Sequence, residues 1–149
     1  KIYTGENMKF LICFLLSFNL YALEISNERV RLLPPGSPTT ALFLDFQNTS
    51  NQEVSLIKAE SNISKKVELH DHIMKDGMMK MEEVSKITIP ANSKISLKPG
   101  GLHIMMIGLK DDLKEGQEIE VKLIFDNKET KVIKPKVVKF MPHHHKHKH

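Results

Sequence analysis

The stretch "ELHDHIMKDGMMKMEEV" (residues 68–84) places histidines close to methionines. His70 and His72 come first, and Met79 and Met81 follow within a few positions. Imidazole nitrogen and thioether sulfur are both neutral donors. Thioether sulfur is also soft, so it favours Cu(I) over Zn(II), Mg(II) or Ca(II). The residue types therefore indicate a site for a soft metal ion.

The same pairing returns in "GGLHIMMIGL" (residues 100–109), which contains His103 and Met105. Methionine in a strand is more often core filler than a ligand, and one His-x-Met pair alone would be weak evidence. Its recurrence in separate segments favours a metal site. Met78 and Met106 fall on the opposite strand faces, so we interpret them as core or surface residues.

The His and Met side chains must be positioned by short apolar segments rich in Val, Ile, Leu, Phe and Thr. Turn residues separate these segments from one another. The stretch 118–126 alternates apolar and polar residues, which is typical of a strand with one buried face. The turn "DNKE" predicts that it forms a hairpin with the next segment. The proline-rich stretch 32–40 should be an ordered loop. The predicted strands cover residues 41–48, 53–60, 65–70, 78–84, 86–90, 94–101, 102–109, 118–126 and 130–138.

Many short strands with no sustained helical periodicity predict an all-β fold, a single β-sandwich domain over residues 23–140. Alternation puts His70 on one face of its strand, together with His72 if that strand continues. Met79 and Met81 share a face of the next strand, and His103 and Met105 share a face of a third. Three segments could thus bring His and Met side chains to one point.

The spacing of four of these residues resembles a known family. His70, ten residues, Met81, twenty-one residues, His103, one residue and Met105 match the H-x10-M-x21-H-x-M signature of the periplasmic copper chaperones called PCuAC proteins. The surrounding sequence, including "ITIPANSKISLKPGGLHIMMIGLK", also resembles that of the PCuAC proteins. The resemblance covers roughly residues 24–135.

This resemblance implies a cupredoxin-like or immunoglobulin-like β-sandwich with a solvent-accessible Cu(I) held by His70, Met81, His103 and Met105. It also implies delivery of copper toward assembly of the copper centre of cytochrome c oxidase. The acceptor would be a periplasmic assembly factor or an oxidase subunit. His72 and Met79 are possible additional donors, and we expect a monomer.

The first residues have the pattern of a secretory signal peptide. From Met8, a basic Lys9 precedes an apolar run at residues 10–18 and a small residue at Ala22. We expect residues 1–22 to comprise upstream residues and a cleaved signal peptide, with the true start at Met8. The only cysteine, Cys13, lies inside the apolar run and lacks the small residue expected before a lipid-modified cysteine. The prediction is a soluble periplasmic protein with no transmembrane segment and no disulfide.

The C-terminal residues 141–149 are rich in histidine, and we interpret them as a flexible tail. Interleaved lysines favour a natural tail over an expression tag. Neutral imidazole suits Cu(II), so the tail could capture that ion. The tail donors would be Met141, His143, His144, His145, His147 and His149.

Other function classes fit the sequence less well. Copper sequestration for tolerance stays open as the alternative to delivery. A blue-copper protein needs a cysteine thiolate, which the processed chain would lack. No catalytic constellation stands out, so we do not expect an enzyme. Lysines spread singly, at a net charge of +4, give no basic stripe for nucleic acid. A purely structural β-sandwich would leave the His/Met spacing as coincidence.

Overall fold

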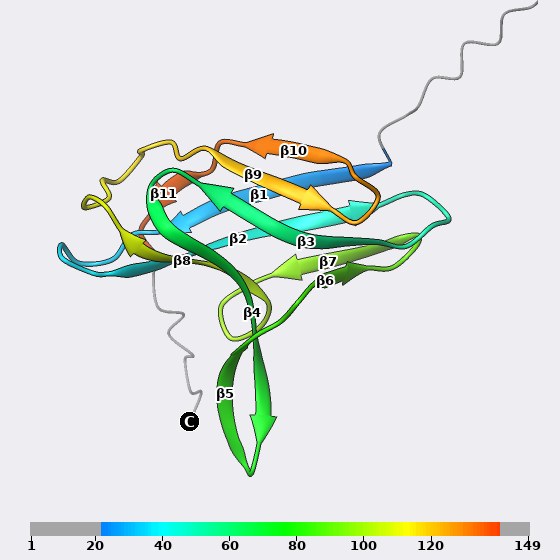
Figure 1. Ribbon diagram of the computed structural model, residues 1–149, viewed down its shortest axis with the longest axis horizontal. Coiled ribbons are helices and arrows are strands. Elements are labelled where there is room, and N and C mark those ends of the chain that lie inside the picture. The colour runs from blue at the N-terminus through cyan, green and yellow to red at the C-terminus, as the bar shows by residue number, and fades with distance from the viewer. Residues whose placement is uncertain (1–21, 141–149) are drawn as a thin grey trace, which may run out of the picture.

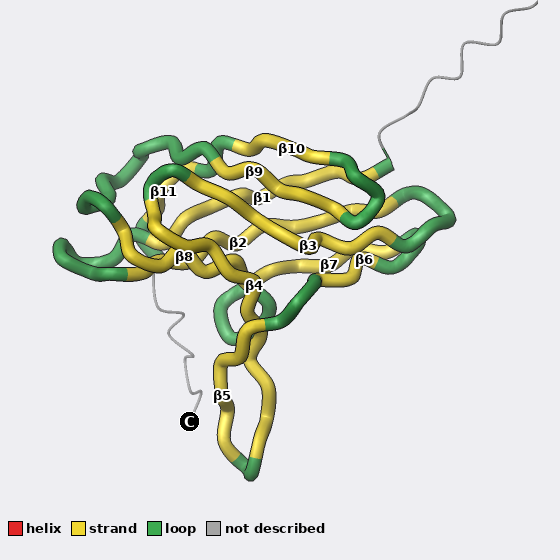
Figure 2. Tube along the Cα trace, in the orientation of Figure 1, coloured by secondary structure: helices red, strands yellow, loops and turns green. Residues whose placement is uncertain are grey.

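The computed structural model describes residues 22–140, which form two β-sheets packed face to face (Figures 1 and 2). This arrangement confirms the predicted all-β sandwich. The strands are β1 (Leu23–Arg31), β2 (Thr39–Asn48), β3 (Val54–Ser61), β4 (Ser64–Lys75), β5 (Met78–Glu83), β6 (Ile87–Ile89), β7 (Ser93–Leu97), β8 (His103–Leu109), β9 (Val121–Phe125), β10 (Thr130–Ile133) and β11 (Lys136–Val138).

The larger sheet has the strand order β11-β1-β2-β8-β4-β5, with β7 also paired to β2. The smaller sheet has the order β10-β9-β3-β6. Strand β4 runs from the sandwich body into a hairpin with β5, and this hairpin projects away from the two sheets (Figure 1). The rest of the larger sheet packs against the smaller sheet, whereas the projecting hairpin does not, and β5 is almost entirely exposed.

The core lies between the sheets and takes alternate residues from the central strands. Leu42, Leu44 and Phe46 of β2 are fully buried, as are Ile104 and Met106 of β8. The Phe46 ring meets the Phe125 ring of β9 edge-on, with centroids 6.0 Å apart. Full burial of Met106 confirms it as a core residue, and its strand neighbours must point to the other face.

The strand predictions were largely confirmed, with two corrections. Strand β1 was not predicted. The segment 130–138 forms two strands in place of one, because Pro135 interrupts it: β10 pairs with β9 in one sheet, and β11 pairs with β1 in the other. The predicted hairpin of 118–126 with the following segment is present as β9–β10.

Candidate metal site

Three adjacent strands of the larger sheet bring the predicted residues to one face. In the antiparallel register His70 of β4 lies directly opposite His103 of β8, and His72 of β4 lies directly opposite Met81 of β5. Residues directly opposite each other in such a pair project from the same face. Alternation along β8 puts Met105 on this face as well.

This face is the outer surface of the larger sheet. Ile104 and Leu69, the neighbours of His103 and His70 along their strands, belong to the buried core between the sheets. The histidines must therefore point away from that core. The predicted donors consequently lie on the outside of the sandwich.

His103 is arranged to present a lone pair to Met81. Its Nδ1 lies 2.9 Å from the carbonyl oxygen of Gly101, which can only accept a hydrogen bond. In the neutral ring Nδ1 therefore carries the proton, and Nε2 carries a lone pair. This Nε2 lies 3.2 Å from Sδ of Met81, which is also an electron-pair donor. Two donors that face one another in this way are suited to share a metal ion.

The turn before β8 fixes the Gly101 carbonyl. The amide of Gly101 donates to the carbonyl of Lys98 at 3.0 Å, and the amide of Lys98 donates to the carbonyl of Leu102 at 3.0 Å. Gly100 has a φ of +83°, a conformation that favours glycine. The "KPGG" sequence thus forms a tight turn that orients His103.

Burial of His103 favours the neutral form of its imidazole. His103 is only 3% exposed, and this desolvation lowers the pKa of its imidazole below the ordinary value of 6.5. The neighbouring His72 and His70 lower this pKa further, while the hydrogen bond to Gly101 raises it. A neutral imidazole is the form that binds a metal ion.

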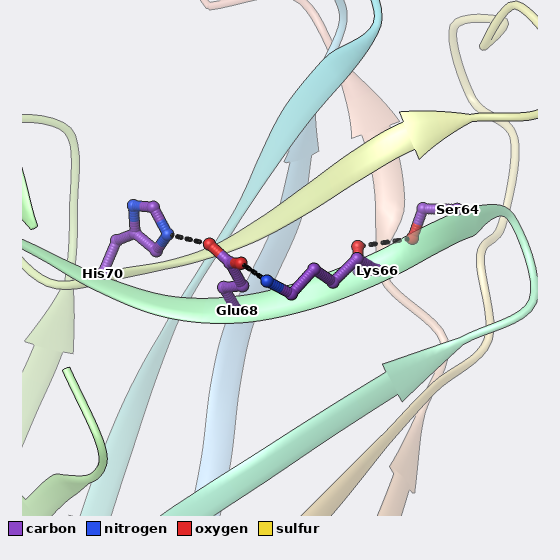
Figure 3. A network of polar contacts seen from close by, with 4 residues as sticks. All are labelled: Ser64, Lys66, Glu68 and His70. Carbon is purple, nitrogen blue, oxygen red and sulfur yellow. Dashed lines mark hydrogen bonds and ion pairs between the residues drawn. The ribbon is translucent and has the colours of Figure 1, made fainter. Parts of the chain in front are cut away.

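His70 is held by a charged network along its own strand (Figure 3). Its Nε2 lies 2.6 Å from Oε2 of Glu68, and Glu68 forms an ion pair with Lys66. Lys66 and then His70 lower the pKa of the Glu68 carboxyl, so Glu68 is the hydrogen-bond acceptor. In neutral His70 the lone pair then lies on Nδ1, which is buried and has no hydrogen-bond partner among the described residues. An orphaned, buried imidazole nitrogen fits a metal ligand.

His72 belongs to the same cluster because strand β4 continues to Lys75. Its ring centroid is 5.3 Å from that of His103, and the centroids of His70 and His103 are 5.6 Å apart. Nδ1 of His72 lies 3.3 Å from the Gly101 carbonyl oxygen, so one carbonyl orients two imidazoles. The three imidazole rings thus lie close together on the outer face, and the structure shows a contact with Met81 for His103.

Aromatic rings form one wall of this cluster. The Phe43 ring on β2 lies 6.1 Å from the His103 ring, and the Phe140 ring lies 5.3 Å from that of Phe43. Arg29 stacks over both phenylalanine rings, at 5.8 and 5.7 Å. This wall excludes water from one side of His103, which accounts for its burial.

The methionines are more exposed than the histidines. Met81 is 45% exposed and Met105 is partly buried. Met79 shares the face of Met81 but lies further out on the hairpin, and Met78 is a surface residue on the opposite face. Between residues 22 and 140, no group of three or more His, Cys, Asp or Glu side chains is placed to hold a metal ion. The donors that the structure brings together are of mixed type, imidazole and thioether.

Some expectations concern residues outside the described range. These are the signal peptide with Met8 and Cys13, and the tail donors Met141, His143, His144, His145, His147 and His149. No helix among residues 22–140 is long and apolar enough to cross a membrane.

Sequence reasoning assigned no role to Glu68, Gly101 or Phe43. Glu68 and His70 are two positions apart on one strand, so alternation already places them on the same face. This spacing could have indicated their contact. The contact of Phe43 with His103 depends on the pairing of β2 with β8, which local pattern does not contain.

Comparison with known proteins agrees with this architecture. The fold is shared with the copper-bound PCuAC domain from PmoF2, which is 19% identical with a TM-score of 0.68 over 80% of this chain and 94% of that domain. The solution structure of CuI-DR1885 from Deinococcus radiodurans is 27% identical with a TM-score of 0.66, covering 82% of this chain and 83% of that one. The described chain therefore has a PCuAC-like fold.

Sequence relatives extend over the same region. A "Putative lipoprotein" of Leifsonia xyli subsp. xyli (strain CTCB07) is 41% identical over 96 residues, which are 64% of this chain and only 58% of that protein. The family profile described as "Putative lipoprotein LpqE-like" matches residues 23–137, nearly the whole sandwich. The chain therefore belongs to the LpqE-like family.

Proposed function

We propose that this protein is an exported copper chaperone that binds one Cu(I) ion on the outer face of the larger sheet. The proposed ligands are His70, Met81, His103 and Met105, with His72 as an additional donor. The copper ion is cargo, and each of these residues acts as a ligand and not as a catalyst.

The observation that carries this proposal is the 3.2 Å approach of His103 Nε2 to Met81 Sδ. Neither atom has a proton to offer once Nδ1 of His103 donates to Gly101, so the contact is not an ordinary hydrogen bond. A cation between the two lone pairs would stabilise it. Neutral sulfur and nitrogen donors suit a soft monovalent ion.

The exposure of the site favours a carrier. Met81 is within reach of solvent, whereas His103 is buried against Phe43. An acceptor protein could therefore replace the sulfur ligand first and the histidines afterwards. Because the imidazole and thioether donors are neutral, each ligand can be exchanged in turn, and no buried charged ligand stays behind once Cu(I) has left.

Two solved structures of the same fold support copper as the metal. One of them is a copper-bound domain and the other contains Cu(I). We propose a periplasmic location and an acceptor in the assembly of the copper centre of cytochrome c oxidase, either an assembly factor or an oxidase subunit. Sequestration of copper for tolerance is the alternative role. A strain that lacks the protein would separate the two, since loss of oxidase activity supports delivery and copper sensitivity alone supports sequestration.

We also propose that the C-terminal tail captures Cu(II) through Met141, His143, His144, His145, His147 and His149. The test is a competition titration with Cu(I) and with Cu(II), on the full chain and on a chain that lacks residues 142–149. One tight Cu(I) equivalent that survives removal of the tail supports the core site. Loss of all copper binding with the tail would overturn the proposed site.

A further inference from the structure

The β4–β5 hairpin carries a second methionine pair beyond the proposed Cu(I) site. Met74 of β4 lies directly opposite Met79 of β5. Met74 follows His72 by two residues, and Met79 precedes Met81 by two residues, so all four project from the same face of the hairpin. The outer face of β4 and β5 thus presents two successive cross-strand pairs, His72 with Met81 and then Met74 with Met79.

These two methionines have no role in the apolar core. Met74 is 67% exposed and Met79 is 59% exposed, the former more than any other large apolar residue in the described chain. Burial in the core therefore does not explain them. Directly opposed residues in an antiparallel pair have Cβ atoms about 5 Å apart, which lets two flexible thioethers approach one ion.

We propose that Met74 and Met79 form a second, weaker Cu(I) site at the solvent end of the hairpin. This second site rests on the proposed function, Cu(I) binding by the protein, only because both sites would take the same ion. The rise of a strand puts the second pair about 7 Å from the pair of His72 and Met81. Two thioethers without an imidazole make a weaker set of donors, so this site fills after the first one.

The position of the pair suits the arrival or departure of copper. Met74 and Met79 belong to the β4–β5 hairpin, which projects from the two sheets (Figure 1), so another protein can approach them. His70 and His103 pair further back, where β4 runs beside β8. A Cu(I) ion bound at Met74 and Met79 would reach Met81 by moving one cross-strand pair inward. No proton or electron transfer accompanies this exchange between neutral ligands.

Methionine methyl NMR on the full chain, titrated with Cu(I) under reducing conditions, tests the proposal. The matched control is Met78, an exposed methionine on the same hairpin but on its opposite face. We expect the first equivalent to shift the methyl signals of Met81 and Met105, and further Cu(I) to shift those of Met74 and Met79 but not that of Met78. The double variant Met74→Leu/Met79→Leu should weaken the second step by at least about tenfold and leave the first unchanged.

Two results would overturn the proposal. One is equal movement of the Met78 signal, which means that exposed methionines bind Cu(I) without a site. The other is a second step that survives unchanged in the double variant, which would place the second ion away from Met74 and Met79. Failure of the proposed function is distinguishable, because then the signals of Met81 and Met105 do not move in the first step.

Discussion

Nε2 of His103 lies 3.2 Å from Sδ of Met81, while Nδ1 of the same ring is committed to the carbonyl of Gly101 at 2.9 Å. The two residues come from β8 and β5, which are not neighbours in the sheet, since β4 lies between them. The two side chains therefore meet across the outer face of β4.

Substitution of Met81 by leucine should lower Cu(I) affinity by at least about tenfold, because it removes a donor and keeps the volume. The unfolding free energy should change by less than about 1.5 kcal/mol, since the swap conserves volume at a half-exposed position. A competition titration with a Cu(I) chelator measures the affinity. Met78→Leu, on the opposite face of the same strand, is the matched control and should bind Cu(I) as the unmodified protein does. Equal affinities for the two variants would contradict the account.

Glu68→Gln should weaken Cu(I) binding about 10- to 100-fold, the usual cost of losing a carboxylate that orients a ligating histidine. The glutamine removes the charge that holds His70 and ends the ion pair with Lys66. Glu60→Gln is the control, because Glu60 forms a comparable ion pair with Lys58 on β3, away from the histidines. If both variants bind Cu(I) equally well, Glu68 does not position His70.

Asp45 should contribute stability that depends on pH. Hydrogen bonds with Ser96 and Asn27, and the nearby Lys94, lower the pKa of its carboxyl below 3.8. For a carboxyl whose pKa is lower in the folded state, the contribution is fully present above the unfolded value and is lost as the pH falls through the folded value. Asp45→Asn should therefore be less stable than the unmodified protein at about pH 7, and the difference should shrink below about pH 3.8. Urea unfolding at several pH values measures it, and a difference that is constant with pH would be the contrary result.

The contact between the two sheets should dominate the stability. Phe46→Ala should lower the unfolding free energy by about 3–5 kcal/mol, because it opens a cavity beside Phe125. Ile57→Ala, at an exposed position on β3, should cost much less. Thermal or urea unfolding of both variants gives the comparison. Similar losses would mean that Phe46 is not a central core residue.

Local pattern was sufficient to predict the sandwich and the common face of His70 and His72, because alternation in a strand is a local property. Strand β1 was missed since "LEISNERVR" has polar residues at its centre, where the pairing with β2 also shifts register. The division of 130–138 between two sheets depends on Pro135 and on long-range pairing. Pairing was also needed to place His103 opposite His70 and to show that the donors lie outside the sandwich.

The most direct test of the account is X-ray absorption spectroscopy at the copper edge, on the protein loaded with one equivalent of Cu(I). The proposed site should give a first coordination shell that contains both nitrogen and sulfur, with less sulfur in Met81→Leu and an unchanged shell in Met78→Leu. A shell of nitrogen alone, identical in all three proteins, would contradict the proposed site and leave the contact of His103 with Met81 as packing.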